Sequence, residues 1–148
     1  RLYIYTMFGG DDPDDVLESI RFLVTKGGVD VVFLDHITML VTGNENDDER
    51  RKLDYISTKM KKMAKELRFC LVIISHVNDD GKTRGSRNIT KVANTVIHMS
   101  RDLTSTDELT RNTLVLTIEK ARLTGRTGPG GRYFFDTSSY TLKELPDA

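Results

Sequence analysis

In the stretch VVFLDHIT, residues 31 to 38, a run of four apolar residues is followed by an acid that could hold a metal ion. Asp35 follows four apolar residues, and a second apolar run ends in Ser75 and His76. In an open parallel sheet, ligands bind at the carboxyl ends of the strands, so these polar groups are expected to meet in one crevice. An acid there commonly holds a hydrated Mg²⁺ beside the phosphates of a nucleotide. Two other interpretations stay open on this pattern: Asp35 caps the next segment, or it is the acid of a receiver-like domain.

Two cations, Lys120 and Arg122, occupy alternate positions in TLVLTIEKAR, residues 113 to 122. Residues two apart on a strand point to the same face, so both cations are expected to leave one face together. Neighbouring cations repel unless something anionic lies between them, which favours an anionic ligand. The alternative is a solvated edge strand whose paired cations discourage aggregation. The TGRTG that follows suits a close backbone approach and favours the ligand.

Two helices are predicted to support these groups. The first covers about residues 13–26, with Asp12 as its cap and Gly27-Gly28 at its end. The second covers about 47–68, after a polar loop. Its apolar positions fall three and four apart, which predicts one inward-facing stripe: Leu53, Ile56, Met60, Met63 and Leu67.

Strands are predicted to alternate with these helices. Strands are predicted at residues 2–6, 29–35, 69–75 and 95–100, and the way strands and helices alternate suggests a pattern of the βαβαβ type with a parallel sheet. The run at 29–35 is continuously apolar, as in strands buried on both faces. Period-two segments at 113–122 and 131–145 predict antiparallel strands at the far edge of the sheet. The expected fold class is therefore α/β.

Composition narrows the setting. The chain has 148 residues and 38% hydrophobic content, enough for a packed core, and is one domain or part of a larger one. Lys+Arg and Asp+Glu balance at 22 each, so the net charge indicates no partner. The one cysteine, Cys70, is expected to be a buried, inert thiol in a reducing compartment. No apolar run approaches the roughly 20 residues that cross a bilayer, and no signal peptide pattern is present, which predicts a soluble intracellular protein.

Five stretches occur in an order that resembles one known family, the DnaB family of hexameric replicative helicases. They are LDHI at 34–37, DERRKLDYISTKMKKMAKEL at 48–67, VIISH at 72–76, RGS at 84–86 and EKARLTGRTG at 119–128. The similarity is greatest to the branch of phage primase-helicases. It implies a RecA-like three-layer domain with a mostly parallel sheet and antiparallel C-terminal strands, of which residues 1–148 would form the C-terminal part, the P-loop half being absent.

The resemblance implies roles for the residues around the phosphates. Asp35 would be the Walker-B acid that organises Mg²⁺, and His76 the sensor of the γ-phosphate. Arg122 would be the arginine finger that reaches the neighbouring subunit's triphosphate, with Lys120 beside it. For His76 the alternative is a histidine satisfied by backbone at a strand end, and His36 could simply hydrogen-bond within its loop.

The resemblance also implies a base site and a DNA-binding loop. Arg101 and Phe135 match positions that sandwich the nucleotide base, although Phe134 or Tyr133 could take the aromatic place, and any of these rings could instead be core. The loop at 78–91 would grip the backbone of single-stranded DNA through Lys82, Arg84, Arg87 and Lys91. It is shorter than in many phage relatives, and Arg87 and Asn88 replace small residues there. The cation-rich segment at 59–68 is expected to be a solvated helix face.

The expected function is that of an NTP-driven helicase that moves along single-stranded DNA as a hexameric ring. Its cofactors would be Mg²⁺ and ATP or another NTP or dNTP, and its further partners primase and DNA polymerase. The location would be cytoplasmic, in a bacterium or a phage-infected cell, with a mitochondrial source left open. The chain contains no G-x-x-x-x-G-K-[ST] phosphate cradle, so it is expected to be inactive by itself. Because Arg1 leads directly into the strand-like LYIYT, the sequence is expected to be part of a longer protein. Two alternatives remain: a RecA-type recombination ATPase, and a non-hydrolytic module that binds DNA or a partner.

Overall fold

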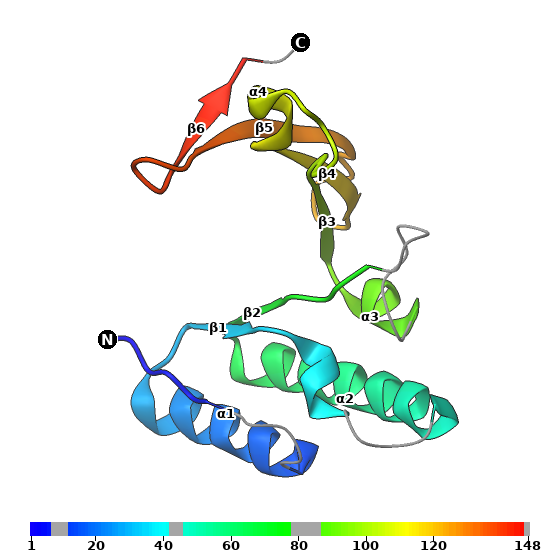
Figure 1. Cartoon of the computed structure of the whole chain (residues 1–148). Helices are drawn as coiled ribbons and strands as arrows, with labels where there is room; N and C mark the ends of the chain where they lie inside the picture. The colour runs from blue at the N-terminus through cyan, green and yellow to red at the C-terminus, as the bar shows by residue number, and fades with distance from the viewer. Residues whose placement is uncertain (7–11, 42–45, 78–86, 147–148) are drawn as a thin grey trace. The chain divides into compact units, whose positions relative to one another are not determined.

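The structure is a computed structural model that describes residues 1–6, 12–41, 46–77 and 87–146 (Figure 1). The chain divides into two compact units, Arg1–Ala93 and Asn94–Ala148, and each is described by itself. The assignment of residues 1–148 to one domain stays a prediction. Along the described ranges, no helix combines the length and the apolar character that crossing a membrane requires.

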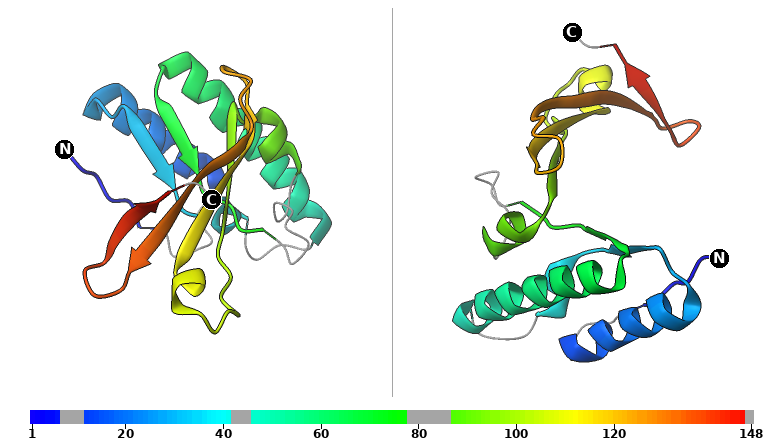
Figure 2. Two further views of the ribbon diagram at one scale, coloured as in Figure 1. Left: turned by 90° about the horizontal axis from the view of Figure 1, so that it is seen from above. Right: turned by 180° about the vertical axis from the view of Figure 1, so that it is seen from behind.

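The first unit contains a parallel pair of strands with helices on one face (Figures 1 and 2). The strands run in register from Val31↔Cys70 to Leu34↔Ile73. The elements, in chain order, are α1 (Pro13–Gly27), β1 (Val31–Leu34), the 3-10 helix η1 (Ile37–Leu40), α2 (Asn46–Leu67), β2 (Cys70–Ile73) and α3 (Arg87–Val92). Buried side chains of α1, η1 and α2 form one core, against which the inner face of both strands packs.

The two long helices confirm the predictions made from periodicity and capping. The Asp12 side chain accepts a hydrogen bond of 2.9 Å from the Asp14 amide, and the helix ends at Gly27, followed by Gly28 with φ 67°. Only a residue without a Cβ takes that left-handed conformation without strain. In α2, the predicted stripe is buried: Leu53 and Met60 are fully enclosed, and Leu67 packs against the same core.

Three expectations for the first unit are wrong. Residues 2–6 form no strand, and Leu2 and Ile4 are more than three-quarters exposed, because no described strand takes their backbone hydrogen bonds. The strand at 29–35 is not buried on both faces: Val31 and Phe33 are exposed, since the helices cover the opposite face. Cys70 is exposed for the same reason, because its register partner is Val31.

The second unit is a four-stranded antiparallel sheet in the order β3-β4-β5-β6 (Figure 2). Its elements are β3 (Thr95–Ser100), α4 (Glu108–Arg111), β4 (Thr113–Ala121), β5 (Gly128–Asp136) and β6 (Thr141–Leu145). The predicted antiparallel strands at 113–122 and 131–145 are confirmed, but they pair with β3 in a sheet of their own and do not extend the parallel pair of β1 and β2. The strand at 95–100 differs from its expected parallel pairing, because its paired neighbour is β4, in antiparallel register. The short helix α4 was not predicted.

Candidate functional site

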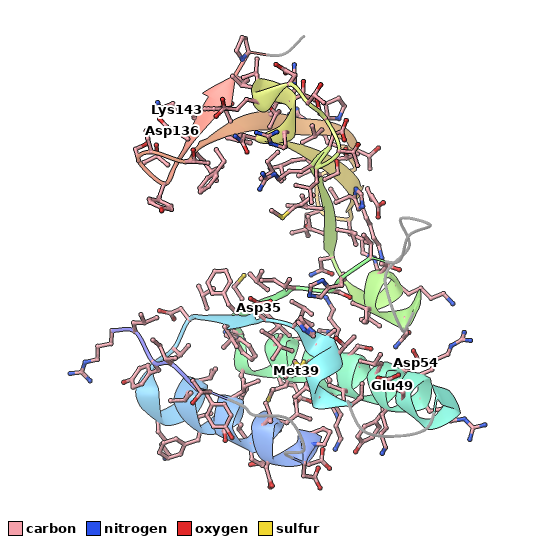
Figure 3. The ribbon with its side chains drawn as sticks, viewed as in Figure 1. Asp35, Met39, Glu49, Asp54, Asp136 and Lys143 are labelled. Atoms are coloured by element: carbon pink, nitrogen blue, oxygen red, sulfur yellow. The ribbon has the colours of Figure 1, made fainter. Side chains whose placement is uncertain are left out.

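Asp35 lies directly after β1 and is exposed (Figure 3). The backbone on either side is fixed by the neighbouring strand, because the Ile74 amide donates to the Leu34 carbonyl at 2.9 Å. The Ile37 amide in turn donates to the Ile74 carbonyl at 3.1 Å, and the Asp35–His36 peptide bond is cis. The carboxylate therefore stands at the carboxyl edge of a parallel pair, where the sequence predicted it.

His36 and His76 meet at the same edge from the two neighbouring strands. Their rings are edge to face, with centroids 4.5 Å apart and an interplanar angle of 89°. The Nδ1 atom of His36 shares a 2.5 Å hydrogen bond with the Thr38 hydroxyl. This hydrogen bond orients the half-buried His36 ring, and that ring borders the exposed His76. Thr38 and the ring contact could not be predicted from spacing, because both depend on how the two strand ends come together.

The residues at this edge fit a magnesium ion that is shared with a substrate. Among the residues that the structure describes, no group of three or more His, Cys, Asp or Glu side chains gathers as a metal cage. Mg²⁺ beside a nucleotide needs no such cage, since it keeps several waters and binds through one or two carboxylates and the substrate phosphates. The exposed Asp35 carboxylate is the group here that would hold it.

Lys120 and Arg122 lie at the end of β4, in the second unit. Lys120 pairs with Val96, next to a register shift in β3, and is half-buried. Arg122 follows the last strand residue and is exposed, while its amide donates to the Asn94 carbonyl at 2.9 Å. The sheet therefore fixes the backbone from which the Arg122 side chain extends. A turn follows at once, because the Gly125 amide donates to the Ala121 carbonyl at 2.7 Å.

Arg101 and Phe135, the predicted base sandwich, both bind Asn112. The Arg101 guanidinium donates to the Asn112 Oδ1 atom at 3.2 Å, and the Phe135 amide donates to the Asn112 carbonyl at 2.9 Å. The Phe135 ring lies edge on to Tyr140, with centroids 6.3 Å apart. Sequence reasoning missed Asn112, because an asparagine between a helix and a strand carries no signal beyond a common helix end.

The predicted DNA-binding residues are only partly described. Lys82 and Arg84 lie outside the described residues, as does the side chain of Arg87. Residues 87–92 form α3, so the end of the predicted loop is helical, and Lys91 is exposed in its last turn. The Asn88 amide group binds α2 through three acceptors, each at 3.1 Å: the Asp54 carbonyl, Ser57 Oγ and Thr58 Oγ1.

A charged pair joins β5 and β6 on either side of the turn between them. Lys143 Nζ donates to Asp136 Oδ2 at 2.7 Å, and the two residues extend from adjacent strands (Figure 3). This hydrogen bond, assisted by the Ser138 hydroxyl and amide, holds the pKa of Asp136 well below its usual range. The pair stabilises the hairpin of β5 and β6 next to Phe135, because Asp136 follows Phe135 directly.

The fold is RecA-like, and solved structures share it. A DnaB-like replicative helicase, described with its interactions with primase, matches 97% of the chain with a TM-score of 0.77 and 20% identity, over 37% of its own length. A KaiC-like protein of Pyrococcus horikoshii OT3 matches 90% of the chain with a TM-score of 0.66 and 18% identity, over 57% of its length. At these identities the likeness shows the fold.

The family follows from comparison of the sequence. Residues 10–139 match the DnaB-like helicase C terminal domain, and the chain belongs to this family. A DNA helicase/primase of Enterobacteria phage T3 is 29% identical over 160 residues, which cover 94% of the chain. The chain spans 28% of the length of that phage protein.

Proposed function

We propose that this chain is the C-terminal part of the motor domain of a replicative DNA helicase driven by nucleoside triphosphates. The complete protein would move along single-stranded DNA as a hexameric ring and unwind duplex DNA. The observation that carries this proposal is the family match over residues 10–139, nearly the whole chain. Primase, which is the partner named for the DnaB-like relative, is a candidate partner here, and so is DNA polymerase.

The first unit would supply the metal acid and the phosphate sensor. Asp35 would hold Mg²⁺, and the metal when bound would offset charge on the phosphates of ATP or another NTP or dNTP. His76 would donate a hydrogen bond to the γ-phosphate. Its ring stands against His36, directly after Asp35, which supports a shared site because the metal and the γ-phosphate are adjacent in such enzymes.

The second unit would supply groups for a phosphate and for a base. Arg122 would act in trans as the arginine finger on the triphosphate held by a neighbouring subunit, with Lys120 beside it. The anchoring of the Arg122 amide on the sheet supports this role, because a finger must be positioned before the charge develops. Arg101 and Phe135 would stack on the two faces of the nucleobase.

Single-stranded DNA would be gripped by the basic segment between β2 and β3. Lys82, Arg84, Arg87 and Lys91 are spaced through a segment that also contains small residues and hydroxyls. Such a composition suits contacts to phosphates without reading of bases. The three hydrogen bonds of Asn88 to α2 would fix the C-terminal end of this segment to the first unit.

An unwinding assay on the complete protein tests this function. With Mg²⁺ and a nucleoside triphosphate, the protein should separate a forked duplex and fail to do so with a non-hydrolysable analogue. A strand-exchange assay in parallel separates a helicase from a recombination ATPase. Strand exchange without unwinding would contradict the helicase function, and DNA binding without nucleotide hydrolysis would instead indicate a non-hydrolytic module.

A further inference from the structure

The Arg101 side chain is held along one edge of its guanidinium group. Its Nε and Nη2 atoms donate to the Arg111 carbonyl at 3.2 and 3.1 Å, and Nη2 also donates to Asn112 Oδ1 at 3.2 Å. The Arg111 carbonyl is one of those left without a helical partner at the end of α4. Since the guanidinium is planar, acceptors along one edge fix the orientation of its plane and leave stacking on its flat faces possible.

Asn112 has the position and the rigidity to set this orientation. It is buried, with 7% of its surface exposed, and its amide donates to the Glu108 carbonyl at 3.0 Å as the cap of α4. At its other end, α4 is capped by the Asp107 carboxylate, which accepts from the Thr110 amide at 2.8 Å. Because the short helix α4 is capped at both ends, Asn112 Oδ1 is held in position to accept a hydrogen bond from Arg101.

The same residue also fixes the backbone of Phe135. The Asn112 carbonyl accepts from the Phe135 amide at 2.9 Å and extends the β4–β5 ladder by one step. Both members of the expected base sandwich are therefore tied to one buried residue, Arg101 through the Asn112 side chain and Phe135 through its carbonyl.

The register of the sheet places Phe135 on the face that Met99 shares. Met99 pairs with Leu116, and Tyr133 pairs with Leu114, two residues along the same strand, so Met99 and Tyr133 share a face, and Phe135 follows Tyr133 by two residues. Arg101 lies just beyond the end of β3, two residues after Met99, and its hydrogen bond to Asn112 Oδ1 holds it next to the start of β4.

β3 and β5 flank β4, so their backbones lie two strand spacings apart, about 10 Å. Continued by one step, the register would set Arg101 level with Tyr133, and Phe135 lies two residues further along β5. Both side chains must therefore lean toward each other, across and along the strands, to hold a flat ring that needs about 7–8 Å between them.

We propose that Asn112 is a positioning residue for recognition of the nucleobase. It holds the Arg101 plane ready, so that a base stacks without first ordering a long, flexible side chain. This inference rests on the proposed function, in which Arg101 and Phe135 contact the base. Asn112 itself touches no nucleotide in this role and acts through Arg101.

The test compares binding of ligands with and without a base by the complete protein in the presence of Mg²⁺. Dissociation constants are measured for a nucleoside triphosphate and for inorganic tripolyphosphate, with Asn112→Ala, Asn112→Asp, Arg101→Ala and the double variant Asn112→Ala/Arg101→Ala. Asn112→Asp keeps the acceptor oxygen. Thr113→Val is the matched control. Thr113 follows Asn112 and is also buried, and its hydroxyl donates to the Leu109 carbonyl and not to a group that holds Arg101. The substitution therefore removes one buried hydrogen bond and leaves those of Arg101 in place.

The expected result is a selective loss of nucleotide affinity. Asn112→Ala should weaken nucleoside triphosphate binding about tenfold, the effect of one hydrogen bond to a charged group, and leave tripolyphosphate binding unchanged. Asn112→Asp and Thr113→Val should bind both ligands like the unmodified protein. In the double variant, Asn112→Ala should add nothing to Arg101→Ala, because the two residues act through one contact.

Three results would overturn parts of this scheme, and they are distinguishable. Equal weakening of both ligands in Asn112→Ala would mean that Asn112 has only a structural role. A selective loss in Arg101→Ala without one in Asn112→Ala would refute the positioning role and leave the base site intact. If Arg101→Ala itself binds both ligands normally, the base site of the proposed function is wrong and the inference with it.

Discussion

His36 and His76 form an edge-to-face ring pair with centroids 4.5 Å apart, at the carboxyl edge of β1 and β2. One ring belongs to the residue after the expected metal acid, and the other to the expected phosphate sensor. Thr38 holds the His36 ring through a hydrogen bond, and the His76 ring packs against that ring. The residue that follows the expected metal acid is therefore in contact with the expected sensor within the first unit.

Replacement of His36 should weaken the response of the sensor without removing it. An edge-to-face ring pair contributes about 0.5–1.5 kcal/mol, so His36→Ala should lower DNA-stimulated nucleotide turnover about two- to tenfold. His36→Phe keeps a ring in the same place and should retain most of the turnover. Steady-state hydrolysis with and without single-stranded DNA measures both. Equal turnover in His36→Ala and the unmodified protein would show that the contact has no part in sensing.

The two exposed acids that flank β1 should differ in their effect on hydrolysis. Asp35 follows the strand at its carboxyl end, whereas Asp30 precedes it and its carbonyl accepts the Cys70 amide at 2.8 Å. Asp35→Asn should lower turnover by about a hundredfold or more, because a charge that organises the metal is lost. Asp30→Asn, which keeps the backbone carbonyl, should be close to normal. Hydrolysis over a range of Mg²⁺ concentrations measures this, and similar losses in both variants would refute the metal role of Asp35.

Removal of the Asn88 side chain should destabilise the first unit. The Ser57 side chain is 1% exposed and accepts from Asn88 Nδ2 while donating to the Asp54 carbonyl at 3.1 Å. Asn88→Ala should therefore lower the free energy of unfolding by about 1–2 kcal/mol, since a buried hydroxyl loses a partner. Thr58→Val, at an exposed contact of the same amide group, should cost less. Urea denaturation followed by circular dichroism compares them, and a smaller loss in Asn88→Ala than in Thr58→Val would contradict this explanation.

Asp136 should make stability depend on pH in the acid range. Its folded pKa lies below the ordinary value of 3.8, chiefly because Lys143 donates to it, so its contribution is complete above that value. As the pH falls from there through the folded pKa, the carboxylate is protonated and the contribution is lost. Asp136→Asn should unfold more readily than the unmodified protein near pH 7, and the difference should shrink below pH 3.8. Thermal melts over pH measure it; a difference that stays constant with pH would refute the ionic cause.

Local patterns predicted the two long helices and the polar ends of β1 and β2 well. The cap at Asp12, the glycine end of α1 and the buried stripe of α2 depend on residues that are close in sequence. The position of Asp35 at the end of an apolar run likewise needs only the strand itself and the rule for parallel sheets.

Features that depend on distant partners could not be predicted in this way. Residues 2–6 alternate like a strand, yet alternation does not supply a hydrogen-bonded neighbour. The pattern at 95–100 does not state that its paired strand is β4. Asn112 and Thr38 orient predicted site residues through contacts that arise only when separate elements meet. Sequence therefore identified the candidate groups, and the structure identified the residues that position them.

We expect the phosphate site to be completed by two subunits, and this sharing can be tested by mixing two inactive variants. Arg122→Ala keeps the metal acid and lacks the finger, whereas Asp35→Asn lacks the metal acid and keeps the finger. Each complete protein alone should be nearly inactive in DNA-stimulated hydrolysis, while Arg126→Ala, a neighbouring exposed arginine, should be active. The mixture should regain hydrolysis, because one subunit supplies the site and another the arginine. Full activity of Arg122→Ala alone, or a mixture no more active than its components, would contradict the shared site.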